Sequence, residues 1–172
     1  MRIGLVSYSI GYVALVAFLY LGLQEYFEDH QSALYVIAAI LLITFLVSAI
    51  LLFSDMRTIG DKTLFLSAVL ISLATAISMV EIKYGIVIGL IGFLLTHVAG
   101  LYVGYQQREV ALIIGSIVGL LFLLSFALDV MSVLAILGII MVVTYPVGLI
   151  QIALKRAEFL FSYANKATSS RR

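Results

Sequence analysis

The stretch REVALIIGSIVGLLFLLSFALDVMSVLAILGIIMVVTYPVGLIQIALKR, residues 108–156, decides how this chain folds. It contains two long apolar runs, 110–128 and 132–154, separated by a short turn around Asp129, and no Lys or Arg lies between its terminal basic residues. A helix needs about 20 predominantly apolar residues to cross the hydrocarbon of a bilayer. Each run therefore predicts a membrane-spanning helix, and the two together predict a membrane hairpin.

The whole chain has the composition of a polytopic membrane protein. Of its 172 residues 64% are hydrophobic and 11% are charged, whereas a soluble domain has about 45–50% apolar and about 25% charged residues. Six apolar runs of spanning length are present, at residues 3–23, 32–53, 63–80, 84–105, 110–128 and 132–154. We therefore expect an all-α fold with six transmembrane helices in residues 1–154. They would form three hairpins, at about 3–53, 63–105 and 110–154, followed by a basic cytoplasmic tail at 155–172.

The basic residues predict the orientation of these spans. With six spans, nine of the ten Lys and Arg residues fall on the side of the two termini, and Lys83 alone falls on the other side. Loops rich in Lys and Arg stay in the cytoplasm, so both termini are expected there. We expect a multi-pass protein of a prokaryotic plasma membrane that contacts lipid and no nucleic acid. The tail carries aromatic and basic residues, and it either lies on anionic lipid or is disordered.

The basic residues that end the even-numbered spans recur at a regular interval. Arg57, Arg108 and Arg156 are 51 and 48 residues apart. A period of about fifty residues that contains two helices indicates a hairpin repeat. The alternative is that any six evenly spaced spans give the same interval.

The side chains of the last hairpin add a resemblance to a known family. The segments GSIVGLL (115–121), LAILGII (134–140) and GLIQ (148–151) resemble the repeated hairpin of the HdeD-like acid-resistance membrane proteins. The resemblance is best over residues 108–156. The outer turn departs from the family, because it carries Asp129 where such hairpins often carry proline. The resemblance implies a six-span membrane protein of the stress or acid-resistance type, without known catalysis.

His97 is the one ionisable side chain well inside a predicted span, about 20 Å from its outer end at 1.5 Å per residue. Such side chains usually face the bundle interior and often mark a proton or solute route, or they only link helices by hydrogen bonds. Residues at a similar depth on three spans complete a candidate mid-membrane polar cluster: His97, Thr44, Thr96, Thr144, Tyr145 and Pro146. This cluster favours a small proton or polar-solute channel or transporter. The alternative is that the threonine hydroxyls bond to their own helices.

Small residues form stripes on the fourth and fifth spans, where they let another backbone approach closely. They are Gly92, Gly100, Gly104, Gly115 and Gly119. The stripes indicate either packing within the chain or the seam of a homo-oligomer. A third function is therefore open, that of an accessory structural subunit in a larger respiratory or transport complex.

The remaining polar residues do not indicate catalysis. The outer acidic loop, defined by Glu25, Glu28, Asp29 and His30, is either a solvated loop or a weak cation site, and its spacing specifies no metal. Asp61 and Asp129 are predicted to cap the third and sixth helices. Tyr8 is predicted to anchor a span end at the membrane interface. No pair of acids sits within the spans, and no Ser, His and Asp set shares one face and depth, so we expect no enzyme, no cofactor and no metal.

Overall fold

The computed structural model describes residues 2–23, 31–53, 58–78, 80, 82–128 and 131–169. The regular secondary structure of these residues is all helical, with no strand, as the all-α prediction requires. In chain order the helices are α1 (Arg2–Leu23), α2 (Gln31–Phe53), α3 (Ile59–Ser78), α4 (Ile82–Gln107), α5 (Val110–Ala127) and α6 (Met131–Ser169). Most helix ends lie within two residues of the predicted ones. The start of α3 and the end of α6 differ more.

The start of α3 corrects the prediction that Asp61 is an N-cap. The helix begins at Ile59, because Thr58 is the capping residue and its Oγ1 accepts a bond from the Asp61 backbone N–H at 3.1 Å. In return the Thr58 backbone N–H donates to Oδ2 of Asp61 at 3.2 Å. These reciprocal bonds form a capping box, with Asp61 at its third helical position. The predicted cap Asp129 lies outside the described residues.

The turn between α4 and α5 is a Schellman motif built without glycine. Arg108 follows the last residue of α4 and has a φ of 52°, in the left-handed region that costs a side-chain-bearing residue about 1 kcal/mol or more. Its backbone N–H donates to the Tyr105 carbonyl at 3.3 Å, and that of Glu109 donates to the Gly104 carbonyl at 2.8 Å. These are the two bonds that define the motif. The chain thereby reverses direction within two residues.

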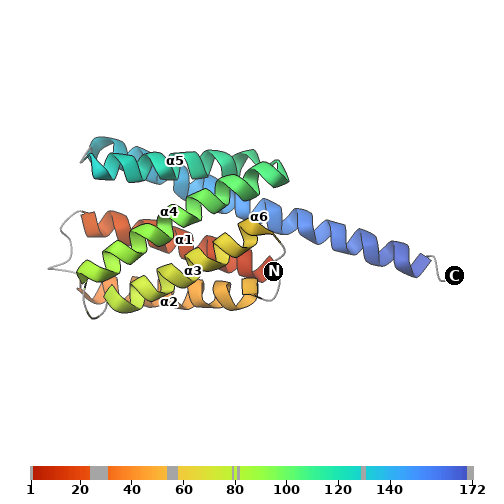
Figure 1. Ribbon diagram of the computed structural model, residues 1–172, viewed down its shortest axis with the longest axis horizontal. Helices are drawn as coiled ribbons and strands as arrows, with labels where there is room; N and C mark the ends of the chain where they lie inside the picture. Colours follow the sequence, from red (N-terminus) through yellow and green to blue (C-terminus); the bar gives the residue numbers. More distant parts are fainter. Residues whose placement is uncertain are drawn as a thin grey trace.

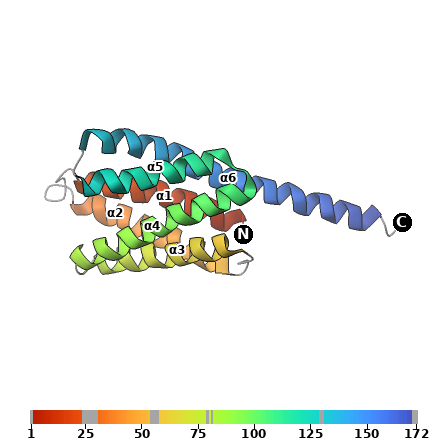
Figure 2. The same ribbon diagram turned by 45° about the horizontal axis from the view of Figure 1, so that its top comes forward.

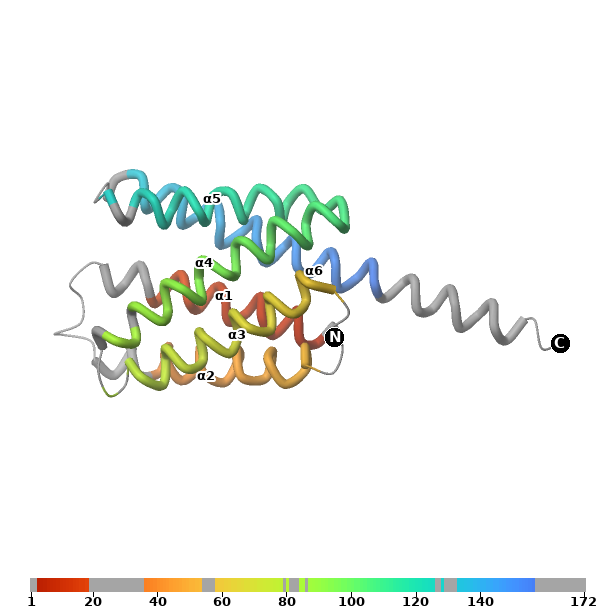
Figure 3. The backbone as a smooth tube through the Cα atoms, viewed as in Figure 1, coloured from red at the N-terminus to blue at the C-terminus, as the bar shows by residue number. Residues whose placement is uncertain are grey.

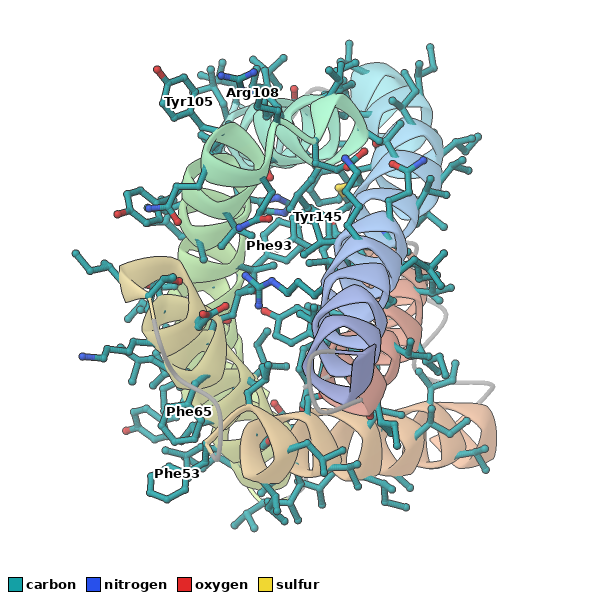
Figure 4. All side chains as sticks on the ribbon, turned by 90° about the vertical axis from the view of Figure 1, so that its right-hand side faces the viewer. Phe53, Phe65, Phe93, Tyr105, Arg108 and Tyr145 are labelled. Atoms are coloured by element: carbon teal, nitrogen blue, oxygen red, sulfur yellow. The ribbon has the colours of Figure 1, made fainter. Side chains whose placement is uncertain are left out.

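The six helices form a closed ring in which each helix packs on its neighbours in the sequence and α1 packs on α6 (Figures 1 and 2). The most extensive contacts join α3 to α4, α5 to α6 and α1 to α2. The backbone tube follows the same side-by-side arrangement (Figure 3). Viewed from the end, the helices surround a centre that side chains fill (Figure 4). A ring of this kind has one inner face for polar groups and one outer face for lipid.

The outer faces of the helices are apolar. Large side chains such as Ile43, Leu94 and Ile139 are exposed there. Four helical stretches are long and apolar enough to cross a membrane: Val36–Phe53, Ile59–Ser78, Val87–Gln107 and Val133–Arg156. The described parts of α1 and α5 contain the shorter apolar stretches Ile3–Phe18 and Val110–Ser125. These findings identify a helical protein with membrane-spanning segments.

Two ion pairs fasten α6 to the starts of α3 and α5. Arg156 donates to Oδ1 of Asp61 at 3.1 Å, and Lys155 pairs with the carboxylate of Glu109. Asp61 and Glu109 are both buried. Helix α6 then continues as a helix to Ser169, beyond the end predicted at residue 154. Two consecutive bases of α6 are thus tied to two different helices.

Candidate functional site

His97 lies at the centre of the ring and is fully buried. Its Nε2 is 3.3 Å from the hydroxyl oxygen of Tyr12 on α1. Two aromatic rings fix the plane of the imidazole. Phe93 and Tyr145 pack edge to face against it, and their ring centroids lie 4.5 and 5.2 Å from the centroid of the imidazole. Figure 4 shows both aromatic side chains inside the ring of helices. An imidazole held in this way has one defined orientation.

The second imidazole nitrogen of His97 has no hydrogen-bond partner. Among the described residues, Nδ1 is the one buried side-chain nitrogen or oxygen without such a bond. Buried polar groups are nearly always bonded, and leaving one unbonded costs about 1–3 kcal/mol. His97 is therefore the exception within an interior that is otherwise paired.

Gly119 on α5 makes room for the imidazole. A Cβ atom at this position would overlap Cε1, Nε2 and Nδ1 of His97. The ring of His97 thus packs directly on the backbone of α5. The small-residue stripe of α5 and the histidine of α4 form one structural unit.

Three hydroxyl groups form a second buried cluster, which includes Thr96, the residue that precedes His97 on α4. The hydroxyl of Tyr8 lies 2.6 Å from Oγ of Ser67 and 2.7 Å from Oγ1 of Thr96. Ser67 also approaches the Leu64 carbonyl at 2.8 Å, and Thr96 approaches the Gly92 carbonyl at 3.0 Å. These four contacts need four protons, while three hydroxyls supply three. Tyr8 therefore donates to one neighbour at a time, and the cluster joins α1, α3 and α4.

Tyr145 of α6 connects the two clusters. Its hydroxyl donates to the backbone carbonyl of Thr96 at 2.7 Å, and its ring stacks on Tyr12 with centroids 4.4 Å apart. This bond crosses the ring from α6 to α4. The described interior is thus an aromatic and polar centre supplied by α1, α3, α4, α5 and α6.

The structure brings some of the predicted cluster residues together and leaves others apart. His97, Thr96 and Tyr145 meet at the centre. Thr44 and Thr144 are only partly buried, and their hydroxyls donate to carbonyls of their own helices, those of Ile40 and Ile140, at 2.7 and 2.8 Å.

Pro146 is buried, and α6 continues as a helix through it. The residues that were predicted to lie at the level of His97 thus do not all point to the inside of the ring of helices.

The glycines of the predicted stripes contact neighbouring helices of the same chain. Cβ atoms at Gly92 and Gly104 would lie 2.8 and 2.9 Å from Ile71 of α3 and Ile113 of α5. A Cβ at Gly115 would lie 2.6 Å from the backbone nitrogen of Tyr145. Internal packing therefore occupies these faces. The outer acidic loop residues Glu25, Glu28, Asp29 and His30 lie outside the described residues.

Several residues at the centre of the ring were not predicted from the sequence. Tyr8 is fully buried, which corrects its interpretation as an interface anchor, and Tyr12 is buried one turn later on the same face of α1. A pair of tyrosines four residues apart, with serines at Ser7 and Ser9, was the available signal. Ser67 gave no distinct signal, because serines occur throughout the third span.

Comparisons with protein-family models, with curated proteins and with solved structures find no match to this chain. The class of protein thus follows from the fold alone: an all-helical protein with membrane-spanning segments and a buried polar centre.

Proposed function

We propose that the chain is a six-span, non-enzymatic protein of a prokaryotic plasma membrane, of the HdeD-like stress or acid-resistance type, with both termini in the cytoplasm. The closure of the ring by α1 and α6 carries the proposal, because it sets α1 and α5 beside the four helices of spanning length. The three most extensive helix contacts coincide with the three proposed hairpins. The proposed cytoplasmic position of both termini follows from the distribution of Lys and Arg.

Reporter fusions and a survival assay test this proposal. Reporters placed after Gln31 and after Arg172 should lie on opposite sides of the membrane. Cells that lack the protein should survive an acid challenge less well than the parent strain, and expression of the chain should restore survival. Equal survival would exclude the stress role. Stoichiometric co-purification with a respiratory or transport complex in mild detergent would favour an accessory subunit instead.

A second function is favoured by the environment of His97. We propose that the centre of the ring passes or senses protons or a small polar solute. An unbonded, fully buried imidazole nitrogen supports this proposal, because polar groups at such depth are costly and usually serve transport. Tyr12, Tyr145 and Thr96 supply the adjoining hydroxyl groups.

Flux measurements on reconstituted vesicles test the second function. The substitution His97→Gln keeps hydrogen-bonding groups but removes titration, so any pH-dependent flux should be lost. The matched control is His30→Gln, which makes the same change in the only other histidine of the chain and should leave flux unchanged. Flux that is absent in the parent protein, or equal in both variants, would exclude a transport role for His97.

A further inference from the structure

Polar atoms of two helices, α5 and α6, lie against Gly100 on α4, one turn from His97. A Cβ atom at Gly100 would overlap Oγ of Ser116 on α5 and would lie 3.0 Å from the hydroxyl oxygen of Tyr145 on α6. At the same contact between α4 and α5, Gly119 of α5 faces His97 of α4. Ser116 and Gly119 are three residues apart and therefore lie on one face of α5. The imidazole of His97 and two hydroxyl groups from other helices therefore border the same contact of α4 with α5 and α6.

Both hydroxyl groups can accept further hydrogen bonds. Ser116 already donates its proton to the Leu112 carbonyl at 2.7 Å, and Tyr145 donates its proton to the Thr96 carbonyl at 2.7 Å. Each oxygen keeps lone pairs that can accept a bond. Neither can donate to Nδ1 of His97 without giving up its present bond. Neither oxygen is bonded to Nδ1 in this structure, so a molecule that bridges them to the nitrogen would complete its hydrogen bonding.

We propose that a small neutral molecule with hydrogen-bond donors, of about the size of water, binds between Nδ1 of His97, Oγ of Ser116 and the hydroxyl of Tyr145. If Tyr12 donates to Nε2, Nδ1 carries the proton and the molecule accepts that bond while it donates to the two hydroxyl oxygens. If Nε2 donates to Tyr12, Nδ1 accepts from the molecule, and a water then has one proton left to donate to one of the two hydroxyl oxygens. Both arrangements require donors in the bound molecule, and water meets the requirement in either.

The surroundings favour a neutral molecule over an ion. The walls near His97 are the rings of Phe93, Tyr12 and Tyr145, which meet its imidazole edge to face. Among the residues whose side chains the structure describes, the charged ones lie at the starts of α3 and α5 or on the turn of α6 that pairs with them: Asp61, Lys62, Arg108, Glu109, Lys155 and Arg156. An ion at the centre would lack a counter-charge, which is costly at that depth. The inference rests on the second function proposed above, for which it names the class of solute.

Nitrogen NMR of the full-length protein in lipid tests the binding. In a His30→Gln background, 15N-histidine labelling reports His97 alone. We expect the Nδ1 signal to be shifted to the position of a hydrogen-bonded nitrogen and to show a cross-peak to protons at the water frequency, or at the frequency of an added neutral solute. Ser116→Ala should weaken that cross-peak severalfold. A signal typical of an unbonded nitrogen in the His30→Gln protein would overturn the proposal.

A matched serine variant makes the test specific. Ser72 of α3 is also buried and also donates to a carbonyl of its own helix, that of Ala68 at 2.9 Å, so Ser72→Ala should leave the cross-peak unchanged. Equal loss in Ser116→Ala and Ser72→Ala would overturn the site. A cross-peak in a protein without flux would support the site with a resident water, while the transport function would fail. Flux without a cross-peak would overturn the site and retain the transport function.

Discussion

Arg156 bridges two helices that are not neighbours in the ring, so its replacement tests how the ring is held closed. It bonds the carboxylate of Asp61 at 3.1 Å, with side-chain exposures of 21% and 3%. The substitution Arg156→Met removes the charge and keeps most of the volume. Breaking a buried ion pair costs about 3–5 kcal/mol, because the remaining charge is left uncompensated. The Thr58 backbone N–H still bonds Asp61, and Arg156 is partly exposed, so we expect a loss of about 3 kcal/mol.

The neighbouring residue supplies the matched control for Arg156→Met. Lys155→Met removes one positive charge from the same turn of α6, but the Lys155 side chain is 53% exposed against 21% for Arg156, so water screens this pair more and we expect a smaller loss, of about 1 kcal/mol. Denaturant titration in mixed micelles gives the free energy of unfolding of both variants. Equal losses would refute the reasoning. So would full additivity in the double variant Asp61→Asn/Arg156→Met, because paired residues must show a coupling energy.

Two further predictions concern backbone geometry and helix contacts. In thermal unfolding, the Arg108→Gly variant should be more stable than the Arg108→Ala variant by about 1 kcal/mol. Both substitutions remove the charge, but only glycine accepts a φ of 52° without strain. The reverse order of stability would contradict the Schellman turn. On α6, Gly148→Ala should lower stability by about 2 kcal/mol because its Cβ would overlap the Leu112 backbone. Gly138→Ala should be neutral or gain about 0.5–1 kcal/mol, since its nearest neighbour is Phe122 at 3.7 Å.

The sequence predicted the helices because their signal is one-dimensional. The apolar runs and the charges between them locate each helix without knowledge of its neighbours. The start of α3 was misplaced by four residues because Thr58 and Asp61 were not recognised as a reciprocal pair. The end of α6 was placed at residue 154 because apolarity ends there, whereas the helix itself continues to Ser169.

The centre of the ring was only partly predictable, because depth can be counted along a helix while its facing side cannot. In lipid both faces of a helix are apolar, so hydrophobic periodicity does not distinguish the inner face from the outer one. Thr44 was predicted to belong to the central cluster, yet the neighbouring Phe45 is the residue of that turn that is fully buried. Tyr8 and Tyr12 became recognisable as interior residues only once α1 was placed against α4.

The hydrogen bonds of the centre explain why a ring is favoured over other arrangements of the same helices. In hydrocarbon, apolar side chains gain little from helix association, whereas a polar group without a partner is costly. Tyr8 finds its partners on α3 and α4, and Tyr145 finds its partner on α4. These bonds form only when α1 and α6 close the ring against α4. Since most hydroxyls of the centre are already paired, a molecule that enters it gains most at Nδ1 of His97, where one bond is still unmade.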